Sequence, residues 1–169
     1  MMKLIGLLLG LVLFASNAKA QTQSQFPTAP WGGFAPGKIE CGWLYDANFN
    51  STADQAIPIS VPSALYVVDS ILVTNASVSL TTAAGGVYSA VSKGGVAVVS
   101  SGQAFSGLTS NTANTTGNAL ALTIATAGNT TAFQGFAQTG RISTLYLSLT
   151  TGQGAAATAD FRVYCRPLF

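Results

Sequence analysis

The sequence contains no histidine, only two cysteines and few charged residues. Histidine is the usual general base, the commonest metal ligand and a member of the Ser-His-Asp triad. Its absence excludes most hydrolase mechanisms and the commonest kinds of metal site. The sequence therefore favours a protein that is not an enzyme, with no catalytic residues, no metal site and no cofactor.

Carboxylates offer the remaining route to catalysis, because a pair of them suffices for glycoside hydrolysis. The pairs considered are Asp46 with Asp54 and Glu40 with Asp160. Glu40 and Asp160 lie in strand-like segments whose other face is apolar. A solvated sheet edge, or an ion pair with Arg162 or Arg166, is therefore the favoured interpretation of these two carboxylates.

Charge is scarce and evenly balanced. Charged residues make up 7% of the chain, seven Lys and Arg against five Asp and Glu. Lys3 and Lys19 carry the surplus, so the chain after residue 20 holds five charges of each sign and no net charge. Without clustered cations it offers no attraction for nucleic acid or anionic lipid. Because copies with no net charge repel one another only weakly, the chain can form a homo-oligomer or a larger assembly. The alternative is a monomer whose surface is hydrated by Ser, Thr, Asn and Gln side chains.

Residues 1–20 have the three-part pattern of a secretory signal peptide. A basic start, Met1-Met2-Lys3, precedes the apolar run Leu4–Phe14 and the small-x-small ending Ala18-Lys19-Ala20. The apolar run is too short to span a hydrocarbon core of ~30 Å comfortably as a helix, so an uncleaved membrane anchor is the less favoured alternative. We expect cleavage after Ala20, no stable membrane span in the cleaved protein, and a secreted, periplasmic or cell-surface location.

The two cysteines, Cys41 and Cys165, lie near opposite ends of the chain after residue 20. An even number of cysteines in an exported chain predicts one disulfide, which would close a loop of about 124 residues and remove roughly 4–5 kcal/mol of unfolded-chain entropy. A metal site is the competing use, but the chain has no histidine and no C-x-x-C spacing. The disulfide is the favoured interpretation, and it ties the first strand to the last.

Beyond residue 38 the chain alternates short Val, Leu, Ile and Tyr-rich segments with turns, as antiparallel β structure does. Gly85-Gly86 and Gly94-Gly95 predict tight hairpin turns. No segment has a capped helical stripe. Three segments show the two-residue period of a half-buried strand. Their expected inward residues are Leu145, Leu147 and Leu149; Phe161, Val163 and Cys165; and Ile39, Cys41, Trp43 and Tyr45. Further strands are expected at 57–61, 65–75, 77–81, 87–91, 96–100, 104–108 and 120–125.

These elements predict one domain over residues 39–169, an all-β antiparallel β-sandwich of jelly-roll type. Residues 21–38 hold three prolines and predict an extended arm, because proline cannot enter a central strand. The arm's aromatic residues require a surface, either the domain's own sheet or a partner. The candidate contact residues are Phe26, Trp31 and Phe34.

Exposed aromatic rings on a β-sandwich also stack on sugar rings, which makes carbohydrate binding an alternative function. For each aromatic residue, burial in the core or under the arm competes with that role. The candidates are Trp31, Trp43, Tyr66, Tyr88 and Tyr146.

Two segments, Val67–Tyr88 (VVDSILVTNASVSLTTAAGGVY) and Leu145–Asp160 (LYLSLTTGQGAAATAD), resemble small β-sandwich proteins encoded among bacteriophage structural genes. The likeness covers about Leu65 to Val163 and includes no catalytic signature. It implies a virion structural, decoration or appendage subunit that works through packing and self-association. The signal peptide and the cysteine pair depart from that pattern, since virion proteins usually assemble in the reducing cytoplasm.

The sequence thus favours a non-enzymatic, exported structural or assembly subunit, located in a virion or at a cell surface, whose arm mediates contacts. A secreted carbohydrate-binding or adhesion module is the alternative.

Overall fold

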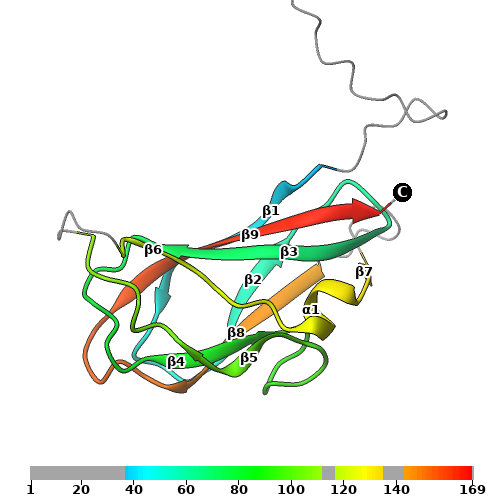
Figure 1. Ribbon diagram of the computed structural model, residues 1–169. Helices are drawn as coiled ribbons and strands as arrows, with labels where there is room; N and C mark the ends of the chain where they lie inside the picture. Colours follow the sequence, from blue (N-terminus) through cyan, green and yellow to red (C-terminus); the bar gives the residue numbers. More distant parts are fainter. Residues whose placement is uncertain (1–36, 112–116, 135–142, 169) are drawn as a thin grey trace, which may run out of the picture. The chain divides into compact units, whose positions relative to one another are not determined.

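The computed structural model describes residues 37–111, 117–134 and 143–168. The described chain is all-β, with one short helix, and every strand pairing is antiparallel (Figure 1). The strands form one sheet in the order β5-β4-β8-β2-β1-β9-β3-β6, with β7 paired to β3. The elements are β1 (Ile39–Asn48), β2 (Gln55–Ile59), β3 (Leu65–Thr74), β4 (Ala84–Tyr88), β5 (Ala97–Ala104), β6 (Ala119–Ala121), α1 (Thr126–Thr130), β7 (Phe133–Gln134), β8 (Ser143–Thr151) and β9 (Thr158–Leu168).

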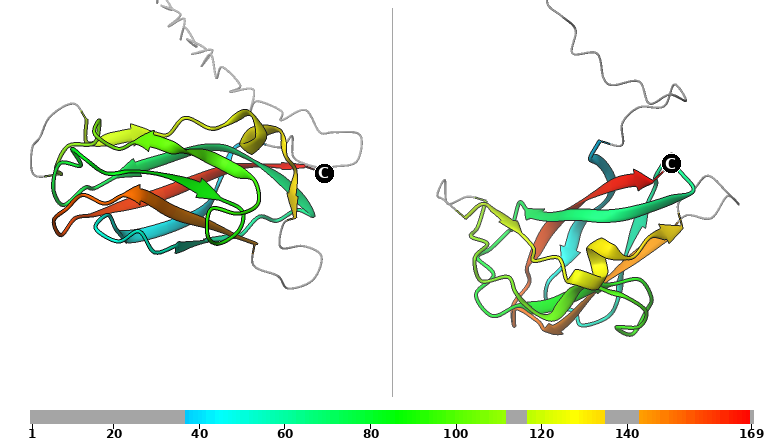
Figure 2. Two further views of the ribbon diagram at one scale, coloured as in Figure 1. Left: turned by 90° about the horizontal axis from the view of Figure 1, so that it is seen from below. Right: turned by 45° about the vertical axis from the view of Figure 1, so that its right-hand side comes forward.

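The sheet curls into a half-barrel around the core, as the views in Figure 2 show. The pairing of neighbouring strands is shortest between β1 and β2, where Gly42 with Ile59 is the only register pair. On the opposite side, the segment from β6 to α1 connects the two ends of the strand order. β6 pairs with β3, and the backbone N–H of Ala125 donates to the carbonyl of Val98 in β5 at 2.9 Å. The core is therefore enclosed on both sides.

Three phenylalanines lie at the centre of this core and are fully buried. Phe49 follows β1, Phe105 follows β5, and Phe161 belongs to β9. The ring of Phe49 lies 4.9 Å from that of Phe105, edge to face, and 5.9 Å from that of Phe161, stacked. The cluster thus joins the segment after β5, at one end of the strand order, to β9 and the segment after β1, which lie in the other half of that order.

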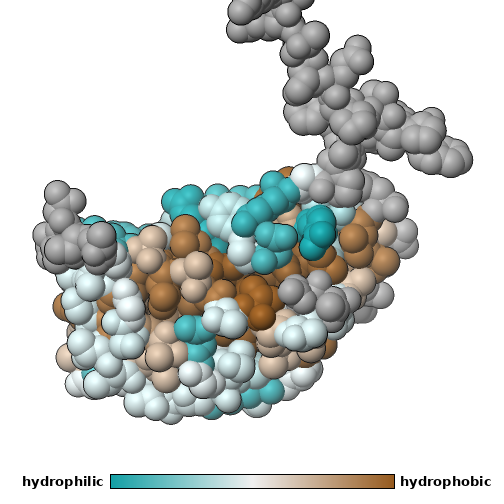
Figure 3. All heavy atoms as spheres, in the orientation of Figure 1, coloured by the Kyte–Doolittle hydropathy of each residue, from teal (hydrophilic) through white to brown (hydrophobic). Residues whose placement is uncertain are grey.

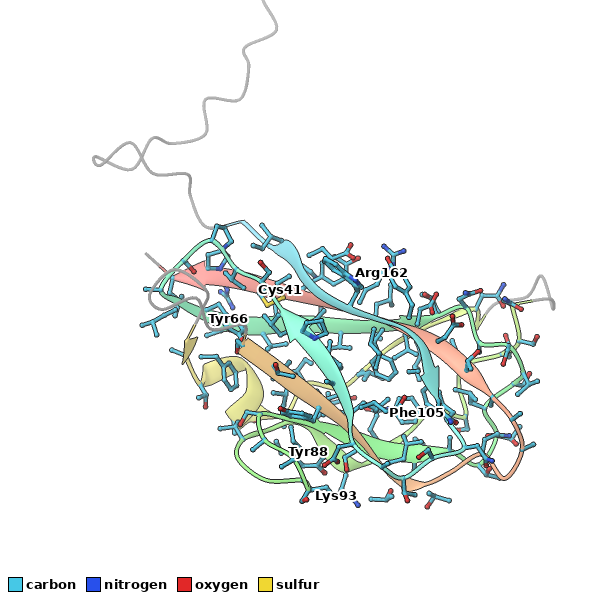
Figure 4. The ribbon with its side chains drawn as sticks, turned by 180° about the vertical axis from the view of Figure 1, so that it is seen from behind. Cys41, Tyr66, Tyr88, Lys93, Phe105 and Arg162 are labelled. Carbon is cyan, nitrogen blue, oxygen red and sulfur yellow. A yellow bond between two sulfur atoms is a disulfide. The ribbon has the colours of Figure 1, made fainter. Side chains whose placement is uncertain are left out.

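The alternation predicted for the last two strands is confirmed. In β8 the leucines at 145, 147 and 149 are buried, and in β9 Phe161, Val163 and Cys165 are buried. The disulfide between Cys41 and Cys165 is also confirmed, with a Cα–Cα distance of 5.7 Å across β1 and β9. It lies inside the curl of the sheet (Figure 4).

The prediction that Trp43 and Tyr45 point inward is wrong. The register of β1 against β9 shifts between Glu40 and Gly42, where Cys41 is the extra residue of a β-bulge. Cys41 and Gly42 are consequently both buried, and the residues that follow exchange faces. Trp43 and Tyr45 are 47% and 53% exposed. A bulge of this kind reverses the direction of the side chains that follow it, here as far as the second register shift between Leu44 and Ala47, after which Ala47 is buried again.

A hairpin connection between β4 and β5 contains Gly94-Gly95 as predicted, but Ser92 and Lys93 occupy the central positions of its tight turn. The turn predicted at Gly85-Gly86 is wrong, because both glycines lie within β4 and are buried. Glycine is needed there for close approach, since β4 runs between β8 and β5. A Cβ on Gly85 would lie 2.6 Å from the Cα of Leu149, and one on Gly86 would lie 2.5 Å from the carbonyl oxygen of Val99.

Gly86→Ala is expected to lower the free energy of unfolding by about 1–3 kcal/mol, because the added methyl group must displace backbone rather than a flexible side chain. Gly102→Ala is the matched control, since a Cβ at Gly102 in β5 meets no atom within 4 Å. Chemical unfolding measures both variants. Equal midpoints for the two would contradict the close packing of β4.

The remaining strand predictions differ in extent. Segment 77–81 is a loop, and of segment 104–108 only Ala104 belongs to a strand, β5. Leu80, Phe105 and Leu108 are nevertheless buried, and the N–H of Leu80 donates to the carbonyl of Leu108 at 3.0 Å. Their apolar residues serve the core without a strand ladder. β4 begins three residues before the predicted 87–91, and α1 and the two-residue β7 were not predicted. Both are too short to leave a periodic signal.

Candidate binding face

The outer face of β1, β9 and β3 combines exposed aromatic rings with most of the charges. We call this surface the β1–β9 face. Trp43 and Tyr45 are its most exposed aromatic residues, and Arg162 is the cross-strand partner of Trp43. Figure 4 shows Arg162 on the outer side of β9, away from the core. Hydrophilic atoms also gather over β9 and β3 along the top of the described part in Figure 3.

Ion pairs occupy the middle and one end of this face. Arg162 contacts Glu40 at 3.4 Å, which confirms the predicted ion pair for this carboxylate. The carboxylate of Asp69 forms ion pairs with the Nζ atom of Lys38 at 3.2 Å and with the guanidinium of Arg166 at 3.8 Å. These side chains are a third to a half exposed, and such pairs contribute about 0–1 kcal/mol each. Their charges therefore remain largely accessible to a partner.

Lys38 also lies over an aromatic ring, with its Nζ atom 5.0 Å from the centre of the Tyr164 ring. A cation over a ring is stabilised by about 0.5–1 kcal/mol at an exposed site. Tyr164 is cross-strand to Glu40. Tyr164 and the two exposed aromatic residues of β1 thus place three rings on one face.

The other end of the face carries carboxylates. Asp160 accepts the backbone N–H of Asp46 at 2.9 Å and the side-chain amide of Asn75 at 3.0 Å. Asp46 and Asn75 both have positive φ angles, 50° and 58°, a conformation that Asn and Asp adopt more readily than most residues. Among the described residues, no salt bridge reaches Asp46 or Asp160.

The charges of the chain are consequently concentrated. Of the ten charged residues after residue 20, seven lie on or at the edge of the β1–β9 face. Arg141 is outside the described residues. The remaining two, Asp54 and Lys93, lie together at a separate polar depression, and Figure 4 shows Lys93 on the opposite side of the molecule from Arg162.

That depression has a volume of about 330 Å³ and is lined by Asp54, the turn residues Ser92 and Lys93, and Ser148 among others. Asp54 accepts the backbone N–H of Ser92 at 2.6 Å. This bond, a second one from the Ser148 hydroxyl and the nearby charge of Lys93 lower the pKa of Asp54, against a smaller opposing effect of burial. A lowered pKa stabilises the fold above the ordinary Asp pKa, and that contribution is lost as the pH falls.

The turn beside Asp54 has a strained backbone. Ser92 and Lys93 have φ angles of 57° and 59°, and the N–H of Gly94 donates to the carbonyl of Val91 at 3.0 Å. This geometry matches a type I′ turn, in which Asn-Gly is preferred at the two central positions. Ser-Lys is an unfavourable pair there.

Lys93→Gly is therefore expected to raise the free energy of unfolding by about 0.5–1 kcal/mol, because glycine adopts positive φ without steric cost. Lys93→Ala is the control, since it removes the same charge and keeps the Cβ. Thermal unfolding compares the two. A glycine variant no more stable than the alanine variant would show that the turn is unstrained.

The residues predicted for sugar stacking separate into two groups. Tyr66 and Tyr88 are buried, which removes both from any sugar-stacking surface, and Tyr146 is half-buried. The hydroxyl of Tyr66 bonds to that of Ser143 at 2.8 Å, and burial raises its pKa. Trp43 alone of the described candidates is widely exposed. Phe26, Trp31 and Phe34 lie outside the described residues.

Neither Tyr45 nor Tyr164 was predicted as a binding residue. The alternation of β9 already placed Tyr164 on the outer face, whereas Tyr45 was expected to point inward because the bulge at Cys41 leaves no signal in the sequence. The predicted carboxylate pairs are not brought together as pairs: Asp160 bonds to the backbone of Asp46, Glu40 bonds to Arg162, and Asp54 lies at the separate depression.

Among residues 37–111, 117–134 and 143–168, no group of three or more His, Cys, Asp and Glu side chains is arranged to hold a metal ion. No helix in these ranges has the length and apolar character needed to cross a membrane. No protein-family model, curated protein or solved structure matches the chain.

Proposed function

We propose that this protein is a non-enzymatic, exported structural subunit that assembles with other copies of itself, in a virion-like particle or on a cell surface. The observation that carries the proposal is the β1–β9 face, where Trp43 and Tyr45 are exposed and Arg162 lies across from Trp43. Trp, Tyr and Arg are the residues most enriched among those that dominate protein–protein binding. A chain without net charge after residue 20 adds little repulsion between copies.

The strand order supports a jelly-roll architecture for this subunit. If the two-residue β7 is left out and the main strands are numbered 1 to 8, the order divides at the narrow β1–β2 junction into 1-8-3-6 and 2-7-4-5. We propose that these halves face one another as the two four-stranded layers of a jelly-roll sandwich. Viral capsid and lectin domains use this architecture, which is an analogy of fold and not evidence of activity.

Export is part of the same proposal. The Cys41–Cys165 disulfide is compatible with an oxidising compartment, in which such bonds persist. The signal-peptide pattern of residues 1–20 supplies a route to that compartment. The arm, residues 21–38, then becomes the N-terminal segment of the mature chain, where its Phe26, Trp31 and Phe34 are available for contacts with a partner.

Sedimentation velocity of the purified, exported protein tests the assembly proposal. We expect association that increases with concentration and recovery of the protein in a particle or cell-surface fraction of its source. A protein that stays monomeric at high concentration and is found in no such fraction would refute the proposal.

A carbohydrate-binding module is the second candidate, and the exposure of Trp43 and Tyr45 on one face favours it. Glu40 and Arg162 beside Trp43 would accept and donate hydrogen bonds to sugar hydroxyls. Calorimetric titration with soluble polysaccharides tests this candidate. Binding that is lost in Trp43→Ala, by a protein that does not self-associate, would favour it over assembly.

A further inference from the structure

The charges of the β1–β9 face are ordered along the strands. Lys38 and Arg166 lie at one end, where Asp69 neutralises one of the two cations. Asp46 and Asp160 lie at the other end, where no described cation pairs with them. The face is therefore cationic at one end and anionic at the other.

The two ends are too far apart to neutralise each other. Seven residues of β1 lie between Lys38 and Asp46, two of them extra residues at register shifts, so the two side chains are roughly 20–26 Å apart at a rise of ~3.3 Å per residue. Screening at physiological salt reduces interactions between exposed charges beyond about 8 Å. Within one molecule, each end thus keeps an excess charge that a partner can neutralise.

A second copy of the chain matches this pattern. Two copies can pack face to face about a two-fold axis that lies in the plane between them and runs at right angles to β1, next to Trp43. The β1 strands of the two copies then run in opposite directions. The cationic end of each then meets the anionic end of the other, as a self-complementary two-fold interface requires. Trp43 and Tyr45, which lie between the charged ends, come to the centre of the contact, where aromatic residues contribute most to binding.

We propose that the β1–β9 face is a two-fold self-association surface, with Trp43 and Tyr45 at its centre and Lys38 and Arg166 of one copy opposite Asp46 and Asp160 of the other. The proposal rests on the proposed function and names the surface through which assembly begins.

The test uses the full chain, exported and purified with its disulfide formed, and measures dimer dissociation by sedimentation velocity. Trp43→Ala is expected to weaken the dimer about thirtyfold or more, the effect of losing a central aromatic residue. Arg166→Glu is expected to weaken it as well. Exchanging all four charges, with Lys38→Glu and Arg166→Glu at one end and Asp46→Lys and Asp160→Lys at the other, reverses the sign of both ends. With Asp69 counted, the ends change from +1 and −2 to −3 and +2, and association is expected to be restored.

Val91→Ala is the matched control, because Val91 is 55% exposed and lies in the turn beside Asp54, away from the β1–β9 face. Its dissociation constant should equal that of the unaltered protein, and thermal unfolding of each variant shows whether it has folded. Rescue by the charge exchange is a result that misfolding cannot produce.

The outcomes separate the surface from the function. If the unaltered protein associates and none of the β1–β9 face variants alters its dissociation constant, this surface is wrong while assembly stands. If the unaltered protein is monomeric throughout, the proposed function itself fails. A dimer that Trp43→Ala weakens but that charge exchange does not rescue would overturn the two-fold arrangement.

Discussion

Phe105→Ala is expected to lower the free energy of unfolding by about 3–5 kcal/mol, the usual cost of truncating a buried phenylalanine. Phe105 is fully buried, and its ring lies 4.9 Å from Phe49 and 6.2 Å from Phe161. The substitution removes the contacts of the Phe105 ring with Phe49, after β1, and with Phe161 of β9. Because these neighbours are held by strands of the sheet, the core has little freedom to collapse into the cavity that the ring leaves. Urea-induced unfolding followed by fluorescence or circular dichroism measures the loss.

Tyr45→Ala is the control for this prediction, because it also truncates an aromatic residue but one that is 53% exposed. Its effect on the stability of the monomer is expected to stay within about 0.5 kcal/mol, as for most surface substitutions. Both are compared at concentrations where the protein is monomeric. Similar losses for the two variants would contradict the central position of Phe105.

Loss of the disulfide has the second large effect. The double variant Cys41→Ala and Cys165→Ala is expected to lose about 2–5 kcal/mol of unfolding free energy, because the bond closes a long loop in the unfolded chain. The cysteines are 124 residues apart in sequence, and both are buried in the sheet. Alanine avoids placing an unpaired hydroxyl in this apolar site.

Reductant provides the internal comparison for the disulfide. It should shift the urea midpoint of the unaltered protein towards that of the double variant and leave the double variant unchanged. Thiol titration shows when the reductant has broken the bond. If the urea midpoint of the protein with two cysteines is then unchanged, the disulfide has no stabilising role.

Much of the fold could be predicted because local pattern and burial agree in the last two strands. The sequences of β8 and β9 alternate, and burial follows the alternation except at Ser148, which is buried between two leucines. The disulfide was predicted from the even number of cysteines, and the inward position of Cys165 in the alternation agreed with it. β1 does not follow its pattern, because the bulge at Cys41 depends on how β1 meets β9 and has no local sequence signal. The turn predicted at the two glycines of β4 was wrong for a related reason. Glycine is favoured both where strands approach closely and in tight turns, so its presence alone does not distinguish the two.

The binding face was only partly predictable. Trp43 was a candidate, but it was assigned to the wrong side of its strand. The gradient of charge was invisible in the sequence, because Lys38 and Asp46 lie more than a hundred residues from their neighbours Arg166 and Asp160. Only the pairing of β1 with β9 brings them together. Asp46 and Asn75, which have positive φ angles, likewise meet Asp160 only in the folded chain.

Native mass spectrometry of the protein purified from its source tests the central claim most directly, because one spectrum reports the N-terminus, the disulfide and the number of copies. An exported assembly subunit predicts a chain that begins at Gln21, contains one disulfide and occurs in complexes of two or more copies. A chain that retains Met1, carries two free thiols and occurs only as a monomer would contradict it.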